Sequence, residues 1–308
     1  MNISTIKDIL DGVVTNAGQI ILGKEHQLRL AITCLIARGH LLIEDLPGVG
    51  KTTLAHVLAR ALGLHFQRVQ FTNDLLPADI LGSSIYDRDK GGFKFHPGAI
   101  FANVVLADEV NRATPKTQSA LLEAMEEQQV TIDSTTYKLP TPFFVIATQN
   151  PTHQVGTFAL PESQLDRFLM RLGMGYPDRQ AERALLTGQD RRELLHSLQP
   201  SLTMEQLLSI QAAVAGVHVS DALLDYLQLI LEFSRKSSSF QSGLSPRAGL
   251  ALLRAAQAWA LMEGKLHVLP EHVQLVLPHV VHHRLQAGGH STAQQTELVA
   301  QLLALPIP

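Results

Sequence analysis

One stretch of sequence constrains the fold of this chain more than any other: residues 45–52 read DLPGVGKT. A short apolar run, His40–Glu44, precedes it, and a helical pattern, Thr52–Leu62, follows it. A glycine turn between a strand and a helix allows backbone N–H groups and the helix N-terminus to converge on an anion. The stretch therefore predicts a strand, a phosphate-binding loop and a helix in succession, the opening unit of an α/β fold.

The side chains of this loop indicate what it would bind. Lys51 can reach the β- and γ-phosphates of a nucleotide, and the Thr52 hydroxyl can ligate Mg²⁺. Asp45 stands where the general pattern has a glycine, so the match is partial, and an ordinary Gly-Pro turn opening a helix is the alternative. The residues predicted to contact the nucleotide here are Gly48, Val49, Gly50, Lys51, Thr52 and Thr53.

The rest of the first half alternates short apolar runs with helical patterns, which is typical of a parallel sheet flanked by helices. The strand candidates are His40–Glu44, Phe66–Phe71, Asn103–Ala107, Phe143–Thr148 and Phe168–Leu172. Two further segments, Ser84–Phe95 and Val130–Leu139, alternate around turn residues and predict hairpins inserted into this α/β unit.

After about residue 195 the strand candidates stop and helix-start signals replace them. Thr203 with Gln206 makes a capping box, and further starts are expected at Ser220, Ser245-Pro246 and Pro270. We expect the helix that begins at Pro270 to be kinked or broken at Pro278. The predicted organisation is an αβα nucleotide-binding domain over residues 1–195 and a small all-α lid domain over residues 196–308.

Composition excludes several other classes of protein. The chain has 308 residues, a net charge of −3 and one cysteine, so we expect neither a disulfide framework nor a global attraction to nucleic acid. It carries no uncharged run of the roughly 18 apolar residues that a membrane span needs, and its N-terminus does not resemble a secretory signal. We therefore expect a cytoplasmic protein without membrane insertion.

Two carboxylates end the apolar run Val104–Glu109, which reads VVLADE. Because the carboxyl ends of parallel strands meet at one edge of a sheet, we expect Asp108 and Glu109 beside the phosphate-binding loop. Asp108 would hold Mg²⁺, directly or through water, and Glu109 would orient and deprotonate an attacking water. Taken alone, the pair is also compatible with a strand that ends in a solvated acidic turn.

A polar residue also ends the run Phe144–Asn150, which reads FVIATQN. Asn150 can hold the same water, or the γ-phosphate, from the opposite side. Pro151 follows, so a plain Asn-Pro turn is the alternative.

Two arginines are candidates for contact with a γ-phosphate. Arg247 lies in the first turn of the helix that begins at Pro246, where the helix dipole disfavours a cation, and a reach back to the γ-phosphate would offset that cost. Arg167 precedes the last strand candidate, far from its own phosphate-binding loop, so it can project into a neighbouring subunit's site. Arg171 is the alternative for that second role, and a solvent-facing arginine or a surface ion pair is the alternative for all three.

His279, His282 and His283 recur at helical spacing, as in some metal sites. No acidic or cysteine partner lies nearby in sequence. We interpret them as a solvated helix face.

The order of several motifs resembles that of the AAA+ ATPases, and within them the MoxR family. The matching segments read DLPGVGKT, FTNDLLPADILG, HPGAIFANVVLADEVNRATPKTQSALLEAMEE, FFVIATQNP, LPESQLDRF and LSPRAG. The resemblance runs from about residue 20 to residue 255. It implies an AAA+ core with hairpin insertions and a helical lid.

The resemblance also implies roles for individual residues. Lys51 and Thr52 look like the Walker A pair and Asp108 and Glu109 like the Walker B pair, while Ile20–Glu25, with Gly23, resembles the segment beside the adenine. The residues with an implied catalytic role are Glu109, Asn150 (sensor 1), Arg167 (arginine finger) and Arg247 (sensor 2).

Beyond the site, the resemblance implies a ring, usually a hexamer, that binds ATP with Mg²⁺ between its subunits. Members of the family act as chaperone-like remodelling ATPases, in some cases for metal-cofactor insertion, and commonly work with proteins that carry von Willebrand factor A domains. The alternatives are a nucleic-acid motor, a magnesium-chelatase-like subunit and a nucleotide-gated switch with negligible turnover. A nucleic-acid motor would need a basic lining, whereas the first hairpin carries Arg88, Lys90 and Lys94 beside Asp87 and Asp89.

Overall fold

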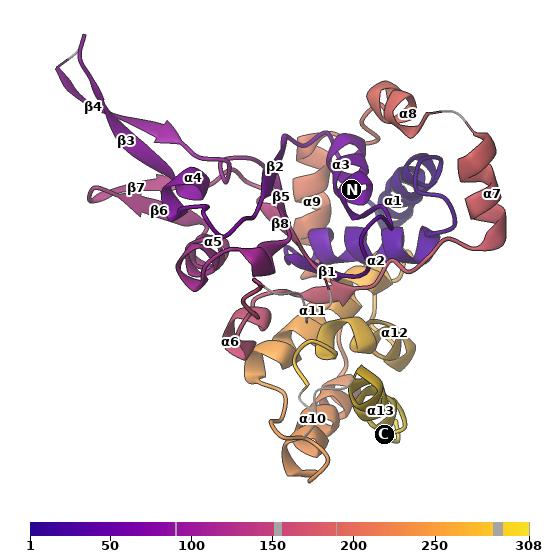
Figure 1. Cartoon of the computed structure of the whole chain (residues 1–308). Helices are drawn as coiled ribbons and strands as arrows, with labels where there is room; N and C mark the ends of the chain where they lie inside the picture. The colour runs from indigo at the N-terminus through magenta and orange to yellow at the C-terminus, as the bar shows by residue number, and fades with distance from the viewer. Residues whose placement is uncertain (90, 151–155, 189, 286–291, 308) are drawn as a thin grey trace.

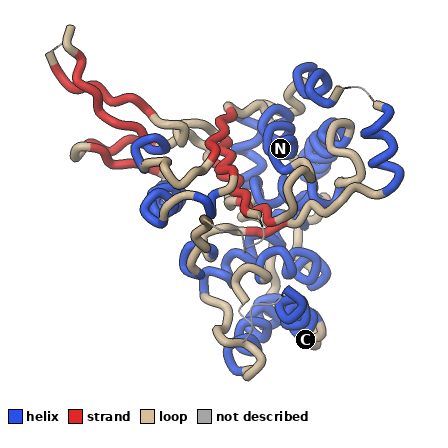
Figure 2. The backbone as a smooth tube through the Cα atoms, in the orientation of Figure 1, coloured by secondary structure: helices blue, strands red, loops and turns tan. Residues whose placement is uncertain are grey.

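A five-stranded parallel sheet forms the centre of the molecule (Figures 1 and 2). The computed structural model describes residues 1–89, 91–150, 156–188, 190–285 and 292–307. In the order in which they lie side by side, the strands are β2 (Phe66–Gln70), β5 (Val104–Asp108), β8 (Phe144–Gln149), β1 (Leu41–Glu44) and β9 (Met170–Leu172). The predicted α/β class with a parallel sheet is confirmed.

The two faces of the sheet are covered by different helices. Alternate residues of a strand point to opposite faces, so Leu41 and Ile43 join one buried cluster and Leu42 joins the other. The first cluster contains α1 (Ile3–Gly18), α2 (Glu25–Ile36) and α3 (Lys51–Ala61). The second contains α5 (Pro115–Glu127). Because both faces are buried, the strands read as continuous apolar runs.

Every predicted strand is present, with ends within two residues of those expected. The largest difference is at β9, which begins at Met170 rather than Phe168. Phe168 is fully buried in the second cluster, and its N–H bonds back to Leu165 in a turn instead of joining the ladder. An apolar run thus marks burial here, and only part of it is strand.

Both predicted hairpins exist and project away from the body of the molecule on the side of α5 (Figure 1). The first pairs β3 (Gly82–Asp87) with β4 (Gly92–Pro97), and Lys90, between these strands, lies outside the described part of the chain. The second pairs β6 (Gln129–Ile132) with β7 (Thr135–Lys138). Asp133 and Ser134 both have positive φ in its turn, as the right-handed twist of a two-residue hairpin requires.

Short helices connect these elements. They are α4 (Pro77–Leu81), the 3-10 helix η1 (Val110–Arg112), α6 (Glu162–Leu165), α7 (Arg179–Thr187) and α8 (Arg191–Ser197).

The chain after residue 196 is helical, as expected, over its described residues. Its helices are α9 (Met204–Val214), α10 (Asp221–Lys236), α11 (Pro246–Met262), α12 (Pro270–Val281) and α13 (Thr292–Leu303). The hydroxyls of Thr203, Ser220 and Ser245 each accept from the N–H three residues later, and Thr203 forms the predicted capping box with Gln206. These helix starts are confirmed because capping is a local contact that the sequence displays directly.

Of the kink or break expected at Pro278, the break is wrong and the kink stays a prediction. α12 runs through Pro278 to Val281. A proline removes one intrahelical hydrogen bond, but Leu277, Val280 and Val281 on either side of it are fully buried, and their burial holds the helix together.

The interpretation of the three histidines as a solvated face is also wrong. His283 is buried and its Nε2 lies 3.0 Å from the Phe168 carbonyl oxygen, while His279 and His282 are half-buried beside Arg171. Burial lowers the pKa of both His279 and His282 to about 4. Among the described residues, no cluster of three or more histidine, cysteine or acidic side chains is arranged to hold a metal ion.

The helical half packs directly on the α/β half. α11 contacts α1 and α2, α12 contacts β9, and one buried cluster runs through all of them. The boundary between residues 195 and 196 therefore stays a prediction. Within the described part of the chain, every helix is too short or too polar to span a bilayer.

Candidate functional site

Three neighbouring strands deliver polar residues to one edge of the sheet. β5, β8 and β1 are adjacent and parallel, so the segments that follow them meet at their carboxyl ends. The loop that follows β1 is residues 45–50, Asp108 and Glu109 end β5, and Asn150 follows β8.

The loop after β1 has the conformation that a phosphate-binding turn needs. Gly48 and Gly50 have φ of 84° and 94°, in the left-handed region that favours glycine. A Cβ at either position would meet nothing within 4 Å, so the backbone angle, and not crowding, requires glycine here. Val49 lies between them, and α3 begins at Lys51 with Thr52 and Thr53 in its first turn.

Lys51 is the centre of the hydrogen-bond network at this edge. Its Nζ donates to the Asp45 carbonyl oxygen at 2.7 Å and to Asn150 Oδ1 at 3.0 Å, and the residue is 8% exposed. Burial lowers the pKa of Lys51, and the carboxylates of Asp45, Asp108 and Glu109 oppose that shift. An ammonium that donates to one carbonyl and one amide oxygen among nearby carboxylates can donate to phosphate oxygens in exchange for these contacts.

Asp45 stands where the general loop pattern has a glycine, and its side chain stabilises the start of the loop. Its carboxylate accepts the Leu46 N–H at 2.7 Å and the Gly175 N–H at 2.5 Å. Gly175 lies beyond β9, so this side chain fastens the start of the loop to a neighbouring segment. A glycine at position 45 would lack both contacts.

The two carboxylates at the end of β5 are held by different partners. Asp108 is buried, accepts from Thr148 Oγ1 at 2.6 Å, and pairs with Arg68 at 2.6 Å. Glu109 has φ of 57°, a left-handed conformation that costs energy in a non-glycine residue and is often found at active sites. Its Oε1 accepts from Asn150 Nδ2 at 2.9 Å.

Lys51, Asn150 and Glu109 therefore form one hydrogen-bonded chain, which the sequence predicted as a convergence but not as direct contacts. The Asn-Pro turn proposed as the alternative involves Pro151, which lies outside the described residues.

Sequence reasoning missed three residues of this network. Arg68 and Gln70 lie on β2, where Gln70 Nε2 donates to Glu109 Oε2 at 3.0 Å, and Thr148 lies on β8. Polar residues at the end of β2 face the same edge because β2 lies beside β5, a neighbour relation that the sequence did not show.

Gly23 lies in the connection between α1 and α2. Its φ is 66°, and a Cβ added there would lie 2.9 Å from Ala181 Cβ at the start of α7. Only glycine fits this close approach, and its assignment to the adenine side stays a prediction.

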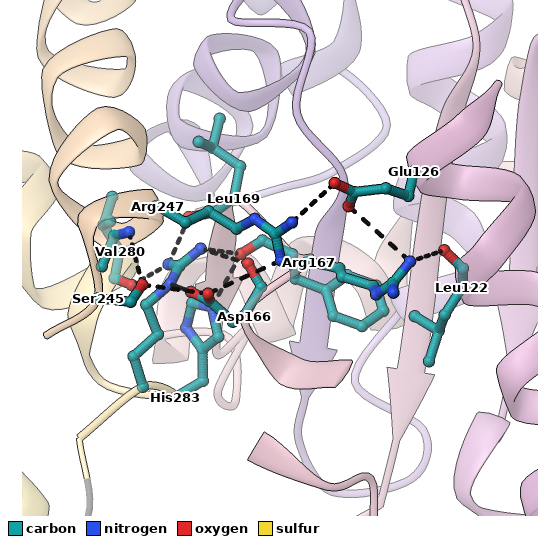
Figure 3. Close-up of polar contacts among 12 residues, drawn as sticks. Leu122, Glu126, Asp166, Arg167, Leu169, Ser245, Arg247, Val280 and His283 are labelled. Atoms are coloured by element: carbon teal, nitrogen blue, oxygen red, sulfur yellow. Dashed lines mark hydrogen bonds and ion pairs between the residues drawn. The ribbon is translucent and has the colours of Figure 1, made fainter. Parts of the chain in front are cut away.

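The arginines lie elsewhere. Arg167 and Arg247 lie together, and both are paired with Glu126 at the end of α5, at 3.9 Å and 2.7 Å (Figure 3). Arg167 Nη1 also donates to the Leu122 carbonyl oxygen at 2.7 Å. Arg167 precedes β9, and β9 is parallel to β1, so both arginines occupy the amino-terminal edge of the sheet. The four residues of β1 separate the two edges, a distance of about 13 Å at 3.3 Å per residue.

This location changes the expectation for Arg247. We expected it to reach back to its own γ-phosphate, whereas its guanidinium bonds to Glu126 and lies 3.9 Å from Asp166. These carboxylates offset its unfavourable position in the first turn of α11.

Arg171, the alternative to Arg167, points into the molecule. It pairs with Glu44 at 3.0 Å and lies 2.5 Å from His282 Nδ1, with 18% of its side chain exposed. Its contacts favour Arg167 for contact with another subunit.

The residues at the carboxyl edge fit a nucleotide triphosphate and a hard divalent cation. The glycine loop and the N-terminus of α3 supply donors for phosphate oxygens, and Lys51 supplies a charge. Thr52 and Asp108 are oxygen ligands of the kind Mg²⁺ prefers. Both Asp108 oxygens already accept hydrogen bonds, from Thr148 and from Arg68, so contact through a water fits better than direct ligation.

Comparison with known proteins agrees with this geometry. The sequence model of the ATPase family associated with various cellular activities (AAA) matches residues 40–170, and that of the AAA lid domain matches residues 232–302. The crystal structure of a protein from Cytophaga hutchinsonii assigned as an ATPase superposes with a TM-score of 0.87 at 34% identity, covering 98% of this chain and 95% of that one. The fold and the site define an AAA+ ATPase.

Relatives that match over most of their length show which family of AAA+ ATPases the chain belongs to. The chain is 44% identical to YeaC of Bacillus subtilis, over 90% of this chain and 87% of the relative. It is 38% identical to chaperone MoxR1 of Mycobacterium tuberculosis, over 96% of this chain and 82% of the relative. The chain belongs to the MoxR family of AAA+ ATPases.

Proposed function

We propose that this protein hydrolyses ATP to ADP and phosphate between the subunits of a ring, most simply a hexamer, and uses the reaction to remodel a protein partner. The observation that carries the proposal is the separation of two half-sites. Lys51, Asn150 and Glu109 are joined at one edge of the sheet, and Arg167 with Arg247 occupies the other. Two copies related by rotation would bring the arginines of one to the nucleotide of the next.

Each residue then has a definite part in the reaction. The loop Gly48–Gly50 and Lys51 bind the phosphates, while Thr52, and Asp108 through a water, would hold Mg²⁺, which would neutralise charge on the phosphates. Glu109 accepts the proton of the attacking water, and Asn150 keeps that carboxylate oriented. Arg167 of a neighbour stabilises the charge that develops on the transferred phosphoryl group, and Arg247 adds to it.

A protein partner is supported by the surface of the first hairpin. Ile85, Tyr86 and Phe93 are 52%, 54% and 77% exposed on β3 and β4, which project from the body (Figure 1). Exposed apolar side chains on a projecting element suit contact with protein better than contact with phosphates. The name chaperone given to the relative from Mycobacterium tuberculosis points the same way. A partner with a von Willebrand factor A domain, a role in metal-cofactor insertion and a cytoplasmic location remain expectations from the resemblance and the sequence.

The test is an ATPase assay on the wild type and two variants. Lys51→Ala should weaken ATP binding about tenfold or more, because it removes the charge that contacts the phosphates. Glu109→Gln should bind ATP with near wild-type affinity and lose about a hundredfold or more in turnover, the range for a general base. Glu232→Gln, an exposed glutamate on α10, is the matched control and should behave as wild type. Wild-type turnover in Glu109→Gln would remove its assigned role.

Mixing experiments test the placement between subunits. Arg167→Ala should abolish turnover while each subunit still binds ATP. Adding Lys51→Ala subunits, which keep their arginines, should restore part of the activity. Mixed rings that stay inactive would argue against an arginine supplied in trans. DNA-stimulated turnover with a steep salt dependence would favour the nucleic-acid alternative instead.

A further inference from the structure

A buried arginine from the helical half holds the segment that carries Arg167. Arg284 follows α12, and 5% of its side chain is exposed. Its Nε donates to Asp166 Oδ1 at 2.7 Å, and its Nη2 donates to the carbonyl oxygens of Asp166 at 3.0 Å and Phe168 at 2.6 Å. Its Nη1 donates to the Leu169 carbonyl oxygen at 3.2 Å. One guanidinium thus binds three backbone carbonyl groups, one before Arg167 and two after it.

Asp166 connects Arg284 to the helix that carries Arg247. Its second carboxylate oxygen accepts from Ser245 Oγ at 3.1 Å and lies 3.9 Å from Arg247 Nη1 (Figure 3). Ser245 is the N-cap of α11, so this contact fixes the first turn of that helix. A single carboxylate therefore joins the end of α12, the start of α11 and the approach to β9.

The arginine pair needs such support because its own contacts are few. Arg167 and Arg247 share Glu126 and line a pocket of about 300 Å³ with Arg284 and Asp166. Two guanidinium groups on one carboxylate repel each other, so their backbones must be fixed from elsewhere. Arginine suits this task better than lysine, since its planar fork can bind several acceptors in a fixed geometry.

We infer that Arg284 is a positioning residue for the arginine pair: it links the helical half to Arg167 and Arg247 through Asp166 and the Phe168 and Leu169 carbonyls, and so sets where both guanidinium groups point. The inference rests on the proposed function, in which this pair serves a neighbouring subunit's nucleotide. Arg284 itself is turned inward and does not reach the nucleotide. Its loss should therefore affect the site of the neighbour and leave its own subunit's nucleotide site intact.

The experiment uses Arg284→Lys in the full-length protein. Lysine keeps a charge opposite Asp166, so no buried carboxylate is left unpaired, but it loses the fork. Turnover should fall about ten- to a hundredfold, the cost of a misplaced catalytic group, while the ATP Kd of the subunit stays within about threefold. Arg60→Lys, which alters an arginine near the end of α3 that also donates to a backbone carbonyl, is the matched control and should keep wild-type turnover. Asp166→Asn should reproduce the Arg284→Lys result and covers the case in which the lysine variant fails to fold.

Subunit mixing separates positioning from general damage. Arg284→Lys mixed with Lys51→Ala should be more active than either alone, because the intact arginines of the second serve the intact nucleotide sites of the first. Arg284→Lys mixed with Arg167→Ala should show no rescue, since the arginine pair is impaired in both variants.

The outcomes distinguish this inference from the function on which it rests. If Arg167→Ala is rescued by Lys51→Ala but Arg284→Lys is not, Arg284 has no positioning role and the proposed function stands. If the wild type does not hydrolyse ATP, or if Arg167→Ala is not rescued in confirmed mixed rings, the proposed function fails and the inference fails with it.

Discussion

At the scale of single residues, Thr148 contacts both Asp108, the last residue of β5, and Glu109, which follows it. Its Oγ1 donates to Asp108 Oδ1 at 2.6 Å and accepts from the Glu109 N–H at 2.9 Å, and it is fully buried. The Glu109 backbone has a left-handed φ of 57° and persists in it because surrounding contacts determine it. Thr148 is one of those contacts, so it orients both the carboxylate assigned to Mg²⁺ and the backbone of the assigned base.

Thr148→Val should therefore slow the reaction without preventing nucleotide binding. Valine keeps the shape but leaves the Glu109 N–H and one Asp108 oxygen without this partner, at a cost of about 1.5–3 kcal/mol for a hydrogen bond to a charged group. Since about 1.4 kcal/mol is a factor of ten in rate, kcat should fall about tenfold or more while the ATP Kd changes less than about threefold. Steady-state ATPase assays and nucleotide titration measure both, with Thr148→Ser as the control that retains the hydroxyl. Unchanged kcat in the valine variant would leave Thr148 a purely structural role.

The sequence could predict Lys51, Asp108, Glu109 and Asn150 because each follows or ends a readable apolar run, and parallel strand ends meet at one edge. It could not predict Thr148, Arg68 or Gln70 as partners. Each lies inside a strand, and the contact it makes spans about 40 positions in the chain. Such contacts depend on which strands become neighbours, a property that no local pattern records.

At the scale of elements, helix starts were readable and some strand and helix ends were not. The caps at Thr203, Ser220 and Ser245 are contacts between residues three positions apart, so sequence alone displays them. The start of β9 and the course of α12 through Pro278 depend instead on burial against other elements. Local rules failed where tertiary packing outweighed them.

The cap of α9 offers a measurable case. Thr203→Ala removes the hydrogen bond that the Thr203 hydroxyl accepts from the Gln206 N–H, while the residue 203 N–H can still donate to Gln206 Oε1, and should lower the free energy of unfolding by about 1 kcal/mol. The loss should be felt globally, because α9 packs on α2, where Gln211 Nε2 donates to the Leu35 carbonyl oxygen at 2.9 Å. Urea denaturation measures the change, and Thr203→Ser, which keeps the cap, should remain close to wild type. Equal stability of the two variants would mean that α9 is held by packing alone.

At the scale of the whole molecule, the sheet separates the two halves of the site. The phosphate-binding loop lies at the carboxyl edge, and Arg167 with Arg247 lies at the amino edge. The sequence predicted this separation for Arg167 but not for Arg247, because the docking of α11 against α1 and α2 is a tertiary contact. His279 on α12, and His282 and His283 directly after it, lie beside β9 and were likewise misjudged as solvated.

Three histidines, His40, His279 and His282, make the free energy of unfolding depend on pH in a definite direction. Burial is the largest cause that lowers the pKa of His40, His279 and His282 to about 4, from an ordinary value of 6.5. Between these values the unfolded chain binds more protons than the folded chain, so the free energy of unfolding rises with pH in that window. Stability should therefore be full above about pH 6.5 and fall as the pH drops towards 4, at about 1.4 kcal/mol per pH unit for each such group where its unfolded form is protonated.

Urea denaturation at pH 7.5, 6.0 and 5.0 measures this slope, and His282→Asn isolates one contribution. Asparagine offers Oδ1 where His282 Nδ1 faces Arg171, and it does not titrate, so the variant should show a shallower pH dependence than the wild type. A slope unchanged by the substitution would mean that His282 carries the same pKa folded and unfolded. The packing of α12 against β9 would then be looser in solution than these contacts describe, because exclusion of water from that interface is the largest cause of the lowered His282 pKa, with the nearby Arg171 charge second.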